Sequence, residues 1–379
     1  MRPVGFRLRV LPLLALASCL AACTTTATTT ATTSADSQSA PWLKEIKNNV
    51  QAQYKGKHLD LVTSGPKAVK NADVWYVSCG EAVSGCASAG AGFKQAASAL
   101  KWKLTYVDGK FDPNTVSAGI EQAVAAGAKA IGINVFDCAA IKTALQKAKA
   151  AGVPVVSTWS TDCSPSLITA ITSFAGTNPK RGLTDYSTDK INWAVAATGG
   201  KAKVIDVYET DLQSTIAQET GYRQGMTACP TCSTVETVKV TVNGLPNLQA
   251  LVSAALTKHP EANVVNIPYG GLLAAGVQAA VTQSGRVGSL QVVGGACDGG
   301  EQALMAKGWN IACGGYEQAQ TGWMTADYIN RLLSGTPASD LPKVGIGYQL
   351  VDRDHRQKSD TFTLPADFRA AYTKVWTGS

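Results

Sequence analysis

Hydrophobic runs and helix-like patterns alternate along the first half of the chain. The apolar runs that predict strands are residues 73–79, 103–108, 130–137 and 153–159. The segments between them place apolar residues at helical spacing over residues 87–101, 114–128 and 139–152, the second of them capped by Asn114. An additional helix is expected before this series, over residues 41–54. A strand followed by a helix is therefore the repeating unit of this half.

The second half repeats this pattern. Strands are predicted at residues 202–210, 234–242, 262–269, 290–297 and 310–316, with clear helices over residues 248–260 and 272–285. Continuously apolar strands that alternate with helices are typical of parallel sheets covered on both faces. The fold class predicted is therefore α/β, with two doubly wound parallel-sheet lobes that meet near residues 175–182.

The N-terminus has the pattern of a secretory signal. Arg2, Arg7 and Arg9 precede an apolar run that is short for a membrane span, and the run ends in the sequence LAAC, at Cys23. This ending resembles the lipoprotein box of bacteria, which implies a signal peptide over residues 1–22 and a lipid on Cys23. Residues 23–41 are rich in Thr, Ala and Ser and are expected to form a flexible tether. A plain signal peptide cut elsewhere is the alternative.

Charge and cysteine content narrow the possible partners and the cellular environment of the protein. Without residues 1–22, the chain keeps 31 basic and 27 acidic side chains, a mild excess with no basic stripe that argues against nucleic acid as a partner. Eight cysteines lie beyond Cys23, and an even number in a secreted chain indicates disulfides. Most of them follow predicted strands, and adjacent strand ends are close enough to be bridged. The pairs expected are Cys79–Cys86, Cys138–Cys163, Cys229–Cys232 and Cys297–Cys313.

Catalytic patterns are missing from the sequence. It contains no Gly-x-Ser-x-Gly motif, and His58, His259 and His355 do not follow predicted strands beside a suitable partner. With the cysteines paired, no metal-ligand spacing remains, so no metal and no cofactor are expected. A thiol oxidoreductase that uses Cys229 and Cys232 is a remote alternative, because redox pairs normally open a helix after a strand. This pair instead precedes a strand, and we expect no enzyme.

The segments at residues 91–156 and 247–281, followed by VVGGACDGG, resemble the two lobes of ribose- and galactose-type periplasmic binding proteins. The resemblance implies an extracytoplasmic solute receptor of an ABC importer, monomeric and held to the membrane by its lipid alone. Two lobes would close on a small molecule by hinge motion and then dock on the permease. The implied hinge crossings are Thr177–Pro179, Gly315–Tyr316 and Val351–Arg353.

The same resemblance implies domain boundaries. Residues 42–71 would be a helical extension before the first lobe. The first lobe would comprise residues 72–177 and 316–351. The second lobe and the C-terminal tail would comprise residues 178–315 and 352–379.

The binding residues of the family map onto this chain with several replacements. Trp159 and Ser160 stand where sugar-binding members usually carry an Asp-Arg pair. Thr220 takes the place of an arginine, Tyr269 of an Asn or Asp, and Tyr316 of the hinge glutamine. The acids Asp137 and Asp298 are kept. Further contacts are expected from loops that follow strands, namely Ser78, Glu81, Ser84 and Asp211.

Aromatic rings in place of arginines leave the ligand class open. Such rings stack on the apolar faces of sugars, purines and benzenoid rings, and beside carboxylates they also hold cations. We expect a neutral sugar, polyol or related polyhydroxy compound first, a nucleoside-like or aromatic solute second, and an amine third. A signalling receptor without transport remains an alternative, because a sensor would bind the same closed lobes.

Overall fold

Two parallel-type sheets form the framework of the chain in the computed structural model, which describes residues 40–57, 60–174, 179–342, 345–359, 362–365 and 367–378. The predicted signal peptide, the predicted lipidation site Cys23 and all but the last two residues of the predicted tether lie outside these residues. Within the described ranges, no helix is long and apolar enough to cross a membrane.

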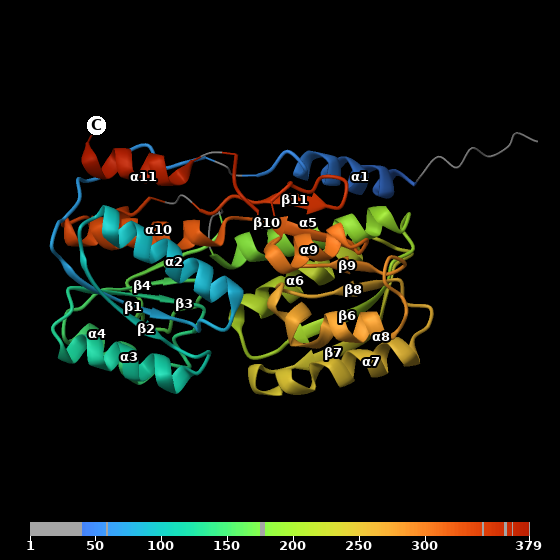
Figure 1. Cartoon of the computed structure of the whole chain (residues 1–379), viewed down its shortest axis with the longest axis horizontal. Coiled ribbons are helices and arrows are strands. Elements are labelled where there is room, and N and C mark those ends of the chain that lie inside the picture. The colour runs from blue at the N-terminus through green and yellow to red at the C-terminus, as the bar shows by residue number, and fades with distance from the viewer. Residues whose placement is uncertain are drawn as a thin grey trace, which may run out of the picture. The chain divides into compact units, whose positions relative to one another are not determined.

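The first sheet has the strand order β2-β1-β3-β4-β5, and all its strands are parallel. Its strands are β1 (Asp73–Ser78), β2 (Lys103–Asp108), β3 (Ala130–Asn134), β4 (Val155–Thr158) and β5 (Ala170–Thr172). Helices α2 (Ser84–Ala99) and α10 (Gln318–Leu333) cover one face, and α3 (Pro113–Ala125) and α4 (Lys142–Ala150) cover the other (Figure 1). Every residue of β3 is buried, as expected of a strand covered on both faces.

The second sheet has the order β11-β10-β9-β8-β6-β7, in which only the β10–β11 pair is antiparallel. Its strands are β6 (Lys203–Glu209), β7 (Ser233–Val240), β8 (Val264–Asn266), β9 (Gln291–Val293), β10 (Asn310–Gly315) and β11 (Gln349–Asp352). Helices α1 (Pro41–Gln53), α5 (Pro179–Ala197) and α6 (Gln213–Thr227) pack on one face. The other face carries α7 (Leu248–Lys258), the turn η2 (Leu273–Val277), α8 (Gln278–Gln283) and α9 (Gly299–Ala306). The short 3₁₀ turns η1 (Val242–Asn247) and η3 (Ala338–Asp340) lie in connections.

Both sheets share one winding scheme. The first strand of each lobe, β1 or β6, lies between the second and third strands, so the strand order reverses direction at that strand. The crevice at such a reversal, beyond the carboxyl ends of the strands, is where open α/β sheets bind ligands. The two-lobed α/β architecture predicted from the alternating pattern is therefore present, and it predicts a site between the loops that follow β1, β3, β6 and β8.

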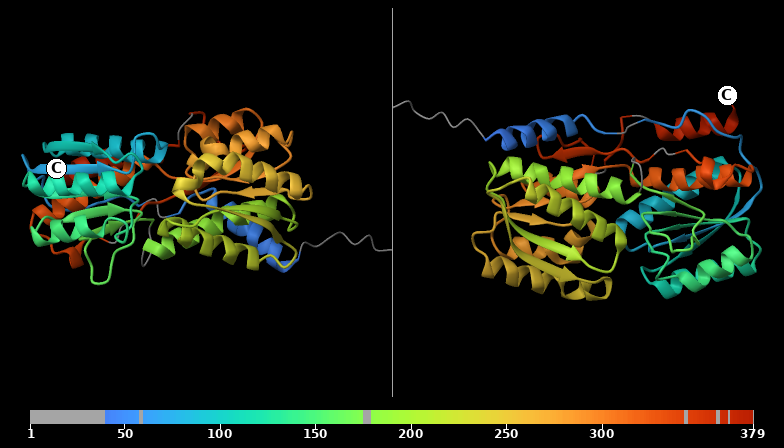
Figure 2. Two further views of the ribbon diagram at one scale, coloured as in Figure 1. Left: turned by 90° about the horizontal axis from the view of Figure 1, so that it is seen from below. Right: turned by 180° about the vertical axis from the view of Figure 1, so that it is seen from behind.

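The termini differ from the expected boundaries. Val351 and Asp352 lie in β11 and pair with β10, so the chain has re-entered the second lobe before the crossing expected at Val351–Arg353. The crossing at Gly315–Tyr316 does lie between β10 and α10, whereas Thr177 falls outside the described residues. The chain also passes between the lobes before β1, because α1 packs on α5 (Figure 2).

The C-terminal helix α11 (Phe368–Thr377) belongs to the first lobe and not to the second. Trp376 stacks on Trp323 of α10 with 5.3 Å between ring centroids, and its indole N–H donates to Asp327 at 2.8 Å. Trp376 is 3% exposed, so the helix completes the core over α10 (Figure 1). Burial of the Phe368, Tyr372 and Trp376 rings explains why the tail returns to this lobe.

Candidate functional site

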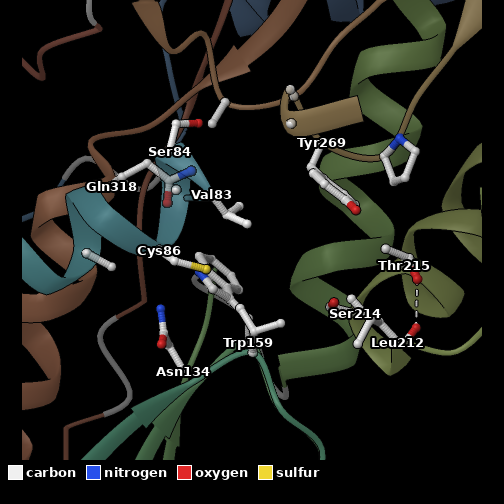
Figure 3. Close-up of a pocket in the computed structure, with 18 of the residues that line it drawn as sticks. Val83, Ser84, Cys86, Asn134, Trp159, Leu212, Ser214, Thr215, Tyr269 and Gln318 are labelled. Carbon is white, nitrogen blue, oxygen red and sulfur yellow. Dashed lines mark hydrogen bonds between the residues drawn. The ribbon is translucent and has the colours of Figure 1, made fainter. Parts of the chain in front are cut away.

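A cavity of about 110 Å³ lies between the two lobes. This volume is several times the amount that one water molecule requires, about 10–15 Å³. The first lobe lines it with Val83 and Ser84 after β1 and with Asn134 and Val135 at the end of β3. The second lobe contributes the loops after β6, β8 and β9, as Figure 3 shows for Leu212, Ser214 and Tyr269. The cavity thus occupies the crevice that the strand order of both sheets predicts.

Four aromatic rings form the hinge side of the cavity. Trp159 follows β4 with a φ of +61°, a left-handed conformation that is costly for a residue with a side chain. Its ring lies 4.6 Å from that of Phe174 and 5.6 Å from that of Tyr316, measured between centroids. Phe174 in turn stacks on Tyr186 at 4.3 Å. The Tyr186 hydroxyl donates to the carbonyl oxygens of Gly295 and Gly314, which ties this aromatic cluster to the second sheet.

Disulfides hold the loops around this crevice. Cys79–Cys86 closes the loop after β1, and Cys138–Cys163 joins the segments that follow β3 and β4. In the second lobe, Cys297–Cys313 connects the β9 loop to β10, and Cys229–Cys232 closes the turn between α6 and β7. These are the four pairs expected from the sequence. Bridged loops have less freedom to lose when a ligand binds.

Two hydrogen bonds cross the cleft directly. The Ser84 hydroxyl, in the first turn of α2, donates to the Asp298 carboxylate at 2.9 Å. Asp137 accepts from the backbone N–H of Gln213, the first residue of α6, also at 2.9 Å. Each bond joins one lobe to a helix N-terminus, where a carboxylate is favoured. The lobes are therefore in contact across the cavity.

Buried charged groups support the second-lobe wall. The Lys190 ammonium donates to the carbonyl oxygens of Pro268 and Gly294, at 3.1 and 2.8 Å, where β8 and β9 end. Burial lowers the pKa of Lys190, and the nearby Glu301 carboxylate opposes that shift. Glu301 caps the N-terminus of α9 together with Asp298 and accepts from the Gly295 N–H. These contacts fix the loops that carry Tyr269 and Asp298.

Glu209, at the end of β6, lies fully buried beside the Tyr269 hydroxyl. Neither its carboxylate oxygens nor that hydroxyl makes a hydrogen bond of good geometry to the rest of the described chain. Burial raises the pKa of Glu209 to about 7, while the Tyr269 hydroxyl opposes the rise. Burial, with the Glu209 charge, also raises the pKa of Tyr269. Tyr269 is therefore a neutral phenol at the wall of the cavity.

Sequence comparison decides the family. A model of the periplasmic binding protein domain matches residues 79–337, more than half of the chain and both lobes. The chain belongs to the periplasmic binding protein family. Its members are solute-binding proteins that work outside the cytoplasm. No curated protein matches the chain at a significant level.

Solved structures share the fold at low sequence identity. The 5-methylthioribose transporter solute-binding protein of Thermotoga lettingae has a TM-score of 0.65 at 16% identity, over 79% of this chain and 98% of that one. The arabinose-transporter binding protein of Shewanella sp. ANA-3 has a TM-score of 0.64 at 17% identity, over 80% and 95%. A Burkholderia graminis solute-binding protein in complex with D-arabinose has a TM-score of 0.66 at 16% identity, over 77% and 99%. At these identities the likeness establishes the fold alone.

Five of the residues expected in the site of this periplasmic binding protein line the cavity. They are Trp159, Tyr269, Tyr316, Asp298 and Ser84.

The other candidates make contacts elsewhere. Ser160 is buried and bonds to the Ser157 hydroxyl. Asp137 accepts from Thr161 as well as from Gln213, and Ser78 donates to Glu81. Glu81 also accepts from the Tyr106 hydroxyl. Asp211 accepts from the Val242 N–H, and the exposed Thr220 bonds back to Ile216 within α6. None of these six is a cavity-lining residue.

Several lining residues were not expected from the sequence. They include Val83, Phe111, Asn134, Phe174, Ser214, Gln218 and Gln318. Two of these residues could have been expected from their positions in the sequence. Asn134 ends the apolar strand β3, and Ser214 lies in the first turn of α6, the helix that follows β6. Phe174 and Gln318 follow β5 and β10 at the hinge, and nothing in their local sequence distinguishes them from core or surface residues.

Proposed function

We propose that this protein is the substrate-binding component of an ABC importer and captures a small polyhydroxy solute, such as a sugar or polyol, between its lobes. The observation that carries this proposal is the cavity formed by strand-end loops of both lobes, bridged by Ser84–Asp298 and by Asp137–Gln213. A ligand held by both lobes favours their closed arrangement, and the closed arrangement is a surface that a permease recognises. The protein binds and releases its ligand without chemistry.

The relatives of known structure support a polyhydroxy ligand. Those quoted above are named for 5-methylthioribose, arabinofuranose and D-arabinose. In this chain, Trp159 and Tyr316 offer ring faces on which the apolar side of a sugar stacks. Asn134, Ser214 and Gln318 supply polar groups from both lobes.

The location proposed is the outer side of the cell membrane. The sequence that ends at Cys23 supports lipid attachment, and residues 24–39 supply a polar tether before α1. The anchored protein acts as a monomer and meets its permease at the membrane. Mass spectrometry of the membrane-extracted protein should find a lipid on Cys23, and Cys23→Ala should release the protein to the soluble fraction. A Cys23→Ala protein that stays in the membrane would contradict the anchor.

The binding experiment is thermal unfolding of the oxidised protein against a panel of pentoses, hexoses, polyols, nucleosides, aromatic acids and amines. A ligand at one hundred times its dissociation constant stabilises the folded state by about 2.7 kcal/mol. That free energy raises the Tm by several degrees in a protein of this size. A rise with a sugar or polyol supports the proposal, whereas a rise with amines or acids alone would contradict the polyhydroxy class.

A further inference from the structure

The cavity is apolar over most of its wall, and most of its polar side chains already make hydrogen bonds within the protein. We infer that the ligand is a neutral polyhydroxy compound that carries an apolar substituent, an aryl, alkyl or alkylthio group, and that this substituent binds against Trp159. The inference rests on the proposed function and narrows its substrate class. An unsubstituted sugar would be the poorer ligand.

The apolar wall comes from both lobes. Val83, Trp159 and Phe111 line it from the first lobe, and Leu212 and Pro268 line it from the second. Figure 3 shows Val83 and Trp159 on one side of the space and Leu212 and Tyr269 on the other. An apolar group between these side chains is removed from water on two sides, and a ring there also gains an edge or face contact with the indole.

Several polar side chains of the wall already have partners. Ser84 and Asp298 bond to each other, and the Thr215 hydroxyl donates to the carbonyl oxygens of Glu209 and Leu212. The Asn134 carbonyl oxygen accepts from the Cys79 N–H, and the Gln218 oxygen accepts from Lys190.

The groups left for a ligand are few. They are the side-chain amide nitrogens of Asn134 and Gln218 and the Ser214 hydroxyl, whereas the Gln318 amide lies beside the Tyr316 hydroxyl and interacts with it. A bare sugar presents hydroxyls on every side, and each hydroxyl buried without a partner weakens binding. A compound with hydroxyls on one side and an apolar group on the other matches a cavity with few free polar groups and a largely apolar wall.

The charges around the cavity favour a neutral ligand. No Arg, Lys or His is among its lining residues, all of which the structure describes. The buried Lys190 directs its ammonium to the backbone carbonyl oxygens of Pro268 and Gly294. A carboxylate or phosphate would therefore lose its hydration without gaining a charged partner. The Asp298 carboxylate is held by Ser84 and by the N-terminus of α9, which leaves it poorly placed to pair with an amine.

The test compares matched pairs of compounds by isothermal titration of the wild-type protein. Each pair shares one sugar and differs by one apolar group: D-ribose with 5-methylthioribose, and D-glucose with phenyl β-D-glucoside. We expect the substituted member of at least one pair to bind ten times more tightly or better than its parent. A tenfold ratio of the two dissociation constants corresponds to a difference of about 1.4 kcal/mol in binding free energy.

Two variants locate the substituent. Trp159→Leu keeps an apolar side chain without the ring. It should reduce the ratio of the dissociation constants of parent and substituted sugar to threefold or less. Ser214→Ala, the control on the opposite wall, should weaken both members equally and leave the ratio unchanged. Unchanged preference in a folded Trp159→Leu protein would overturn the assignment of the substituent to Trp159.

The wild-type titrations alone also decide the inference, so an unfolded variant does not obscure the result. Parent sugars that bind as tightly as their substituted partners would overturn the inference and leave the proposed function standing. Binding of amines or acids, with none of the pairs bound, would overturn both.

Discussion

The Asp137 carboxylate of the first lobe accepts a hydrogen bond from the backbone N–H of Gln213 in the second lobe, at 2.9 Å. The other carboxylate oxygen accepts from the backbone N–H and the hydroxyl of Thr161, each at 2.7 Å. Asp137 is thus fixed by its own lobe and caps the first turn of α6 in the opposite lobe. This contact stabilises the closed arrangement of the two lobes, although Asp137 itself does not line the cavity.

Asp137→Ala should weaken ligand binding without removing a ligand contact. A hydrogen bond to a charged group contributes about 1.5–3 kcal/mol, so losing the contact across the cleft should raise the Kd roughly tenfold or more. Titration calorimetry with any solute that binds the wild type measures this change. Thr161→Val is the matched control, because it removes one bond to Asp137 within the first lobe only. A Kd for Asp137→Ala no higher than that of the control would contradict the closure role.

Opening the Cys138–Cys163 bridge should destabilise the first lobe. The bridge closes a loop with a sequence separation of 25, for which chain entropy predicts about 3.5 kcal/mol. The double variant Cys138→Ser/Cys163→Ser should therefore unfold about 5 °C lower in calorimetry. Cys229→Ser/Cys232→Ser, which opens a loop with a separation of 3, is the control and should lower the Tm less. Equal losses in the two variants would contradict the loop-length argument, and free thiols at Cys138 and Cys163 in non-reducing peptide maps would contradict the pairing.

Glu209 should make stability depend on pH. Its folded-state pKa of about 7 exceeds the ordinary value of 4.5 because the carboxyl is buried. The folded protein therefore keeps a proton that the unfolded chain has lost, and stability falls as pH rises from about 4.5 to 7. The full shift corresponds to about 3 kcal/mol. Denaturant unfolding from pH 5 to 8 should show that Glu209→Gln loses less stability over this range than the wild type.

The control for this series is Glu121→Gln on α3, whose carboxylate forms a surface ion pair with Lys147. It should follow the pH dependence of the wild type. A Glu209→Gln protein whose stability falls with pH as steeply as that of the wild type would show that Glu209 does not hold the proton.

The C-terminal helix should be necessary for the stability of the first lobe. Trp376→Ala removes a buried indole that stacks on Trp323 and bonds to Asp327, a change that costs about 3–5 kcal/mol in other cores. Lys374→Ala on the same helix is exposed and serves as the control. Urea unfolding should separate the two variants clearly. A Trp376→Ala protein as stable as the control would mean that α11 contributes nothing to the lobe.

Most strands and helices of the two lobes could be predicted from the sequence, because strands that are buried on both faces form continuous apolar runs. The apolar run at residues 130–137 predicts β3, and all of Ala130–Asn134 is buried. β5, by contrast, has only three residues and two of them are half-buried, so it left no recognisable pattern. The cap of α3 is Asp112 and not Asn114, since Asp112 accepts from the Thr115 N–H and Pro113 occupies the first helical turn.

Only part of the site could be predicted from the sequence. A predicted strand end shows roughly where a residue lies, but it does not show whether its side chain points into the cavity. Trp159 and Tyr269 follow strands and do line the cavity. Asp137 also follows a strand, yet its partner Gln213 lies 76 residues away in the other lobe. That pairing depends on how the lobes face each other, which no local pattern encodes.

The most direct test of the account is whether a solute binds in the cavity between the lobes. We would titrate the wild-type protein and Ser214→Trp with the sugar or polyol that most raises the wild-type Tm. Ser214 lines the cavity from the first turn of α6, so an indole there fills the space without disturbing either sheet. The account predicts saturable binding to the wild type and none to a folded Ser214→Trp protein. Equal binding to both proteins would place the site elsewhere and contradict the account.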